Sequence, residues 1–259
     1  MQVGVYFVFQ KDVLQEASML VFAPNKTERC FLCGAGGKLT GEHKFKKSLI
    51  DLHSAGGKLE LHNPQFRRPK IAQSSKSKVF HFASKLCEDC NTSKTQAADI
   101  AFEEFHVSLL ENLHASELKA SECLTQFERG NKKIPDDVFR YFAKLMCGFL
   151  ADVDGPRPRQ IASFALGKTS FNPIMLGIEF GSLNESDTVG SEEHVGSHGG
   201  LICEFDPNKA YIRAFQGSQT IGPIRYSFSV RLKWWAQREL SIFFPSLVTL
   251  SRSKIEGVE

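Results

Sequence analysis

Two cysteine pairs are the residues of this chain whose type and spacing point most directly to chemistry. Cys30 and Cys33 form one C-x-x-C pair, and Cys87 and Cys90 form a second, with 53 residues between the two pairs. A C-x-x-C turn aims two thiolates at one point, and two such turns complete the tetrahedron of ligands that zinc prefers. Four sulfur ligands leave no position open for a substrate, so the pattern predicts a structural zinc site.

Residues suited to hydrolytic chemistry lie beside these pairs. Gly41-Glu42-His43 follows the first pair, and Asn91 and Lys94 follow the second. A histidine near its ordinary pKa can accept a proton from water at neutral pH. Oxygen ligands suit a hard divalent cation such as Mg²⁺, which can stabilise the charge that develops when a phosphodiester is hydrolysed. A metal-dependent hydrolytic centre uses residues of these types, although none of them is specific evidence for one by itself.

The order C-x-x-C, Glu-His and then L-C-x-x-C-N-x-x-K resembles the HNH nuclease family in its zinc-stabilised branch, over roughly residues 29 to 99. The resemblance implies a ββα-metal fold in which His43 is the general base. It implies that Glu42 and Asn91 hold Mg²⁺ or Mn²⁺, and that Lys94 faces the same phosphate. It also implies DNA as the substrate, with defence of a bacterium against foreign DNA as one biological role.

Two positions depart from the family pattern. Lys46 stands three residues after His43, where the family often has proline. Phe82 stands where the family usually has an asparagine that orients the loop carrying the base, and His81 lies beside it. His81 is one replacement for that asparagine, and a contact from elsewhere in the chain is the alternative.

Positive charge concentrates in the same part of the sequence. Between residues 38 and 94 there are 12 Lys and Arg against 5 Asp and Glu, although the whole chain carries only +3. A basic block of this kind favours a polyanionic partner. Its candidate nucleic-acid contacts lie in the segment inserted between the cysteine pairs: Arg67, Arg68, Lys70, Lys76 and Lys78. A loop that follows a phosphate backbone and a bland surface loop both fit this composition.

Membrane and disulfide-rich secreted proteins are the classes that the sequence argues against. No apolar run approaches the roughly 20 residues that span a bilayer. The apolar stretch Val3–Phe9 lacks the flanks of a secretion signal and predicts a strand, so the cytoplasm is the expected compartment. An odd number of cysteines, seven, argues against a disulfide framework. The unpaired Cys123, Cys147 and Cys203 are predicted to be buried apolar thiols.

Periodicity predicts the elements around these motifs. Apolar residues at helical spacing predict helices over residues 99–113, 116–129 and 136–153. Alternation of apolar and polar residues predicts a strand over 224–233, with further strands at 173–180, 201–205 and 211–215. The Gly/Ser-rich segment 182–200 is predicted to be a mobile loop.

The sequence therefore predicts an α+β protein. Residues 1–130 would form the ββα-metal HNH domain with its four-cysteine site, and residues 131–259 a mixed domain with helices and an antiparallel sheet. The second domain would recognise DNA, bind a regulatory ligand or form a homodimer. The alternative to an endonuclease is a non-catalytic, zinc-stabilised nucleic-acid-binding module, which would not need Glu42, His43 or Asn91.

Overall fold

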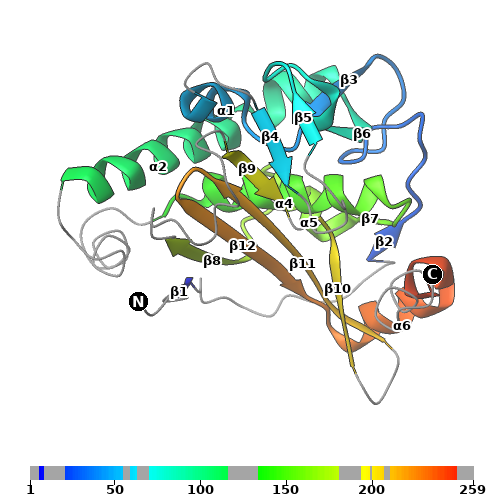
Figure 1. Cartoon of the computed structure of the whole chain (residues 1–259). Helices are drawn as coiled ribbons and strands as arrows, with labels where there is room; N and C mark the ends of the chain where they lie inside the picture. Colours follow the sequence, from blue (N-terminus) through cyan, green and yellow to red (C-terminus); the bar gives the residue numbers. More distant parts are fainter. Residues whose placement is uncertain are drawn as a thin grey trace.

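The fold was analysed in a computed structural model, which describes residues 6–8, 21–54, 59–62, 70–115, 134–180, 194–198, 200–206 and 211–249. Helices and strands are mixed, as predicted, and a large sheet lies at the centre of the molecule (Figure 1). None of the helices in these ranges is both long and apolar enough to cross a membrane.

The large sheet takes strands from both halves of the chain. Its order is β1-β8-β12-β11-β9-β4-β5, and β10 pairs with the other end of β11. Neighbouring strands are antiparallel except for β4 and β9, which are parallel. The strands are β1 (Tyr6–Val8), β4 (Leu59–His62), β5 (Lys70–Ala72), β8 (Met175–Phe180), β9 (His194–His198), β10 (Ile202–Phe205), β11 (Ile212–Ile221) and β12 (Ile224–Arg231).

The two predicted domains therefore share one sheet. Strands β4 and β5 precede residue 130 and pair with each other, and β4 also pairs with β9, which follows residue 130. A single cluster of buried side chains also extends through both halves. The predicted boundary at residue 130 itself lies outside the described residues.

The alternation predicted for β12 is confirmed. Tyr226 and Phe228 are fully buried, whereas Arg225 before them and Arg231 after them are exposed, and Ser227 between them is half-buried. Such alternation packs one face of a strand on the core and leaves the other in water. The turn that joins β11 to β12 contains Gly222 at φ +53°, and a Cβ there would lie 2.4 Å from the ring of His53.

Two of the predicted helices are confirmed as α2 (Gln96–Ala115) and α4 (Asp136–Asp152), and the helix predicted over 116–129 lies outside the described residues. Helix α4 is buried along most of its length and packs against the sheet, where Phe142 and Phe149 meet the Phe228 ring. The remaining helices are α1 (Lys47–Ser54), α5 (Arg159–Ala165) and α6 (Trp234–Phe243).

A separate hairpin carries the predicted site residues. Strand β3 (Leu39–His43) pairs antiparallel with β6 (His81–Cys87), with an irregularity between Gly41 and His43. The π-helical turn η2 (Cys90–Lys94) and then α2 follow β6, whereas α1, β4, β5 and η1 lie between β3 and β6 in the sequence. We call the β3–β6 pair the hairpin. In Figure 1 this hairpin lies above α4. Smaller elements are the 3₁₀ turn η1 (Lys78–Phe80) and the paired strands β2 (Phe22–Ala23) and β7 (Arg157–Pro158).

The hairpin rests on α4 through aromatic packing. The ring of Phe82 in β6 meets the Phe149 ring edge-on at 5.3 Å. Gly148 permits this approach, because a Cβ there would lie 2.8 Å from the Phe82 ring. A residue of the first half is thus packed against a helix of the second.

The prediction of a loop over 182–200 is wrong for His194–His198, which form β9. Backbone hydrogen bonding to β11 and β4 forms this strand, and Gly and Ser side chains do not prevent such pairing. Cys147 is buried as predicted and Cys203 is half-buried. Cys123 lies outside the described residues.

Candidate functional site

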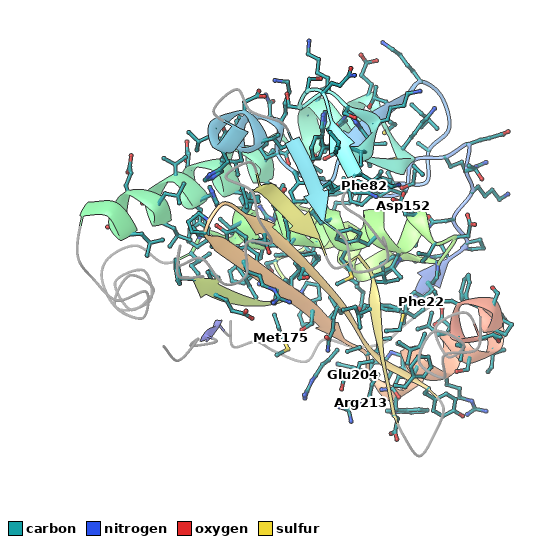
Figure 2. All side chains as sticks on the ribbon, in the orientation of Figure 1. Phe22, Phe82, Asp152, Met175, Glu204 and Arg213 are labelled. Carbon is teal, nitrogen blue, oxygen red and sulfur yellow. The ribbon has the colours of Figure 1, made fainter. Side chains whose placement is uncertain are left out.

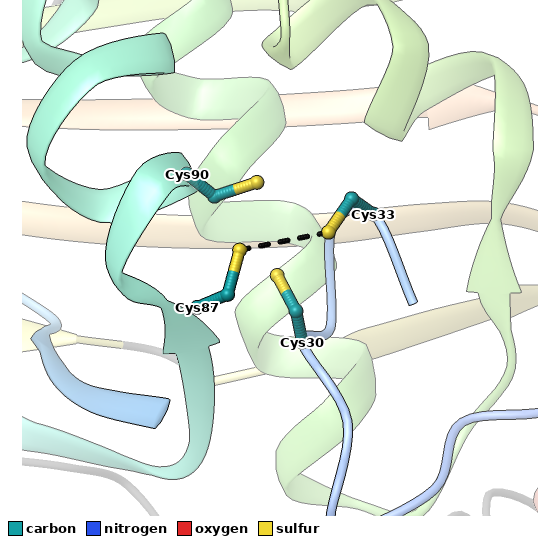
Figure 3. A group of neighbouring side chains, drawn as sticks. All are labelled: Cys30, Cys33, Cys87 and Cys90. Carbon is teal, nitrogen blue, oxygen red and sulfur yellow. Dashed lines mark hydrogen bonds between the residues drawn. The ribbon is translucent and has the colours of Figure 1, made fainter. Parts of the chain in front are cut away.

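The four cysteines of the two C-x-x-C pairs converge. Their sulfur atoms all lie within 4.8 Å of one another, and Sγ of Cys33 is 3.6 Å from Sγ of Cys87 (Figure 3). Tetrahedral zinc with Zn–S bonds of about 2.3 Å separates its sulfur ligands by about 3.8 Å. The cluster can therefore hold a metal ion with little rearrangement.

Cys30 and Cys33 lie on a tight turn that backbone hydrogen bonds hold in shape. Backbone hydrogen bonds close it from Gly34 to the Cys30 carbonyl at 2.8 Å and from Cys30 to the Ala35 carbonyl at 2.9 Å. Gly34 adopts φ +76°, a left-handed conformation that favours glycine. The Ala35 amide points at Sγ of Cys33, 3.4 Å away.

The electrostatics of the cluster also fit a cation. A hydrogen bond with Cys90 lowers the pKa of Cys30 to about 4. The same hydrogen bond raises the pKa of Cys90, and burial raises that of Cys33. Ionisation of Cys30 thus makes ionisation of Cys90 and Cys33 less favourable, because adjacent negatively charged sulfur atoms repel each other. A bound metal ion supplies the positive charge that lets all four ionise.

His43 lies at the end of β3 against His81, its cross-strand partner. The two ring centroids are 3.8 Å apart, and His81 is held in turn by a 3.1 Å contact from Nδ1 to the Ser77 carbonyl. His81 therefore lies against His43, and its role as a replacement for an orienting asparagine stays a prediction.

One ring nitrogen of His43 is buried without a hydrogen-bond partner among the described residues. This nitrogen is Nε2, and His43 also hydrogen-bonds the backbone of Ser75. Burial, and then the charge of His81, lower the pKa of His43 to about 4. The imidazole is consequently neutral at physiological pH, but it is a weaker base than the histidine of ordinary pKa expected from the sequence.

Glu42 points into the protein and is 8% exposed. Its Oε1 lies 2.8 Å from Nζ of Lys144 in α4, and Lys144 also binds Oδ1 of Asp99 in α2. Burial raises the pKa of Glu42, and the Lys144 charge opposes that shift. Two carboxylates, those of Glu42 and Asp99, therefore share the ammonium of Lys144.

Asn91 lies in η2, the turn that follows β6, and contacts the strand that carries Glu42. Its Nδ2 donates to Oγ1 of Thr40 at 2.9 Å and to the Gly41 carbonyl at 3.2 Å. The backbone of Asn91 belongs to the π-helical turn, which closes from the Thr95 amide to the Cys90 carbonyl at 3.2 Å. The structure thus brings Asn91 to the residue that precedes Glu42, although the two side chains bind different partners.

The basic residues predicted to contact nucleic acid are only partly described. Lys70, Lys76 and Lys78 are exposed, whereas Arg67 and Arg68 lie outside the described residues. Lys94 is exposed and forms an ion pair with Asp89, its neighbour in the second cysteine turn. The exposed lysines are accessible to a polyanion.

Sequence reasoning missed the partners that α4 supplies. Lys144 is 1% exposed although it is charged, and its position among apolar residues of an amphipathic helix was the available signal. Asp152, at the end of the same helix, forms an ion pair with Lys44 at 3.2 Å.

A second missed feature is a chain of buried polar side chains. Nε2 of His53 in α1 lies 3.0 Å from Nε2 of His106 in α2, and Nδ1 of His106 lies 2.7 Å from the Tyr226 hydroxyl in β12. The two histidines are 53 residues apart in sequence, so spacing gave no signal of this pairing.

Comparison of the chain with protein-family models, with curated proteins and with solved structures finds no match to any of them.

Proposed function

We propose that the chain is a metal-dependent endonuclease of the HNH type that hydrolyses phosphodiester bonds, with DNA as its substrate. The observation that carries the proposal is the convergence of the four motif elements on one hairpin and the helix after it. The cysteine cluster joins the segment before β3 to the end of β6, His43 ends β3, which pairs with β6, and Asn91 lies in the turn after β6. This chain order is the one that the family resemblance implies.

In this proposal the cysteine cluster binds zinc and has a structural role. Cys30 and Cys33 precede β3, and Cys87 and Cys90 join β6 to the following helix. A zinc ion held by all four would fix the strand bearing His43 relative to the turn bearing Asn91. Four sulfur ligands complete its coordination, so the zinc itself would take no part in hydrolysis.

His43 is the proposed general base. Its Nε2 has no hydrogen-bond partner among the described residues but is buried, so binding of the substrate would have to bring a water molecule to this nitrogen and raise the lowered pKa of the ring toward neutrality. Oε2 of Glu42 and the side-chain oxygen of Asn91 are the proposed ligands of Mg²⁺ or Mn²⁺, which would stabilise negative charge on the phosphate. Lys94 and the exposed lysines of the inserted segment would contact the nucleic-acid backbone.

A plasmid-nicking assay tests this proposal. Losing a general base typically lowers the rate by about 10² to 10⁴, so His43→Ala should nick that much more slowly while keeping its zinc. Glu42→Ala and Asn91→Ala should instead shift the dependence on Mg²⁺ or Mn²⁺ to higher concentration. Assays need varied DNA substrates, because the sequence that the enzyme cuts is not fixed by these residues.

The second candidate, a non-catalytic nucleic-acid-binding module, is favoured by one specific observation. Glu42 is ion-paired with Lys144 and largely buried, as a purely structural carboxylate would be. Such a module would bind DNA through its basic residues and would not cut it under any metal condition. Binding without nicking by the wild-type protein would therefore favour this candidate.

A further inference from the structure

Helix α4 holds both chain neighbours of His43. Glu42 pairs with Lys144 at 2.8 Å, and Lys44 pairs with Asp152 at 3.2 Å. All four side chains are at most 17% exposed. Buried ion pairs of this kind fix geometry more firmly than surface pairs, because water does not compete for the charges.

Each α4 residue is also tied to a second element. Lys144 binds Asp99 of α2 in addition to Glu42. Asp152 accepts hydrogen bonds from the amide and the hydroxyl of Ser84 in β6, at 3.0 Å and 2.9 Å. Figure 2 shows Asp152 beside Phe82, where β6 meets α4. The two ion pairs therefore connect β3, β6 and α2 to one helix.

This arrangement determines where the His43 ring can lie. Glu42 and Lys44 flank His43 along the chain, and both are held to α4 by ion pairs. These pairs therefore limit movement of the backbone that carries the His43 ring, which lies against His81. The Lys44 pair limits rotation of the chain on the other side of His43, directly after β3 ends.

We infer that Lys144 and Asp152 are positioning residues for His43, so that a helix from the second half of the chain completes the centre in the first half. The catalytic consequence of this inference rests on the proposed function, but the structural consequence does not. Release of either ion pair changes the environment of the His43 ring whether or not the protein cuts DNA.

Asp152→Asn is the sharpest perturbation. The asparagine oxygen can still accept both hydrogen bonds from Ser84, while the charge that holds Lys44 is removed. Asp137→Asn is the matched control, because Asp137 pairs with Arg140 on the same helix at 2.6 Å and neither belongs to the hairpin. If Asp152→Asn fails to fold, Lys44→Met/Asp152→Asn is measured instead, since it leaves no charge without its partner.

The first readout is NMR of the His43 imidazole in the full-length protein, with zinc content measured on the same samples. We expect the His43 signals to shift in Asp152→Asn and in Lys144→Met, to stay in place in Asp137→Asn, and to return in Asp152→Glu. A purely structural role for the ion pairs would leave the His43 signals unchanged in every variant that keeps its fold and zinc, and this outcome would overturn the inference.

The second readout is nicking under single-turnover conditions, together with DNA affinity. We expect Asp152→Asn to lower the rate at least tenfold with DNA affinity unchanged, because small displacements of a catalytic group are costly. A rate within twofold of wild type would contradict the inference. If the wild type does not nick while the His43 signals still respond, the proposed function fails and the positioning role stands.

Discussion

The buried His106 predicts a stability that falls as the pH is lowered. Its side chain is 0% exposed and bonded to His53 and Tyr226. Burial, followed by the charge of His53, lowers the pKa of His106 to about 3, whereas an unfolded histidine titrates near about 6.5. Between these values the unfolded chain binds a proton that the folded protein does not.

The sign of the effect follows from that difference in proton binding. Stability is fully present above the unfolded pKa and is lost as the pH falls toward about 3. A pH of about 5 is roughly 1.5 units below the pKa of an unfolded histidine. Protonation of the unfolded state at this pH therefore removes about 2 kcal/mol from the free energy of unfolding. His53, whose pKa burial also lowers, adds in the same direction.

Urea unfolding of wild type and His106→Gln at about pH 7.5 and about pH 5, with zinc in excess, measures this contribution. The free energy of unfolding is expected to fall by about 2 kcal/mol less in the variant than in wild type over that interval. Comparison between the two proteins cancels other groups that titrate, including the cysteine cluster. Equal decreases in the two proteins would show that His106 does not carry the depressed pKa, and that its burial does not have the effect assigned to it.

Three further predictions concern zinc, DNA and packing. Cys87→Ser should release the metal, measured by elemental analysis, and destabilise the hairpin, since structural zinc contributes on the order of 10 kcal/mol at such sites; a zinc-free wild type that is well folded would contradict this. Neutralising Arg67, Arg68 and Lys70 together should weaken DNA binding. The slope of the logarithm of the binding constant against the logarithm of the salt concentration should become shallower by about 1 for each phosphate that the protein no longer neutralises. An unchanged slope would show that this segment is ordinary surface. Gly217→Ala should lower the free energy of unfolding by about 1–3 kcal/mol, because its Cβ would lie 2.7 Å from a phenylalanine ring of the paired strand; unaltered urea melting would show that the ring can move.

Local patterns predicted the elements whose side chains repeat with a clear period. The alternation in β12 and the apolar stripe of α2 record burial on one face, and the apolar residues of α4 repeat at helical spacing although this helix is buried along most of its length, so residue type alone revealed all three elements. The cysteine pairs were equally readable, because a C-x-x-C turn is a local structure with one main chemical use. Their convergence across 53 intervening residues was inferred from the ligand number of zinc.

Long-range pairing was not readable in the same way. Strand β9 forms through backbone hydrogen bonds to β4 and β11, and its Gly and Ser residues carry no apolar alternation that would indicate a strand. The side chains that hold the candidate site were missed for a similar reason. Lys144 and Asp152 lie far from β3 in sequence. They contact Glu42 and Lys44 because α4 packs on the hairpin.

Whether Glu42 and Asn91 hold a catalytic metal ion beside His43 is tested most directly by a crystal structure of the protein soaked in Mn²⁺, with anomalous scattering recorded at the manganese edge. We expect an anomalous peak bound by Glu42 and Asn91, with Nε2 of His43 facing the water molecules of the ion. Manganese found only at exposed carboxylates, with Glu42 still bound to Lys144 alone, would contradict the proposed centre and favour the non-catalytic module.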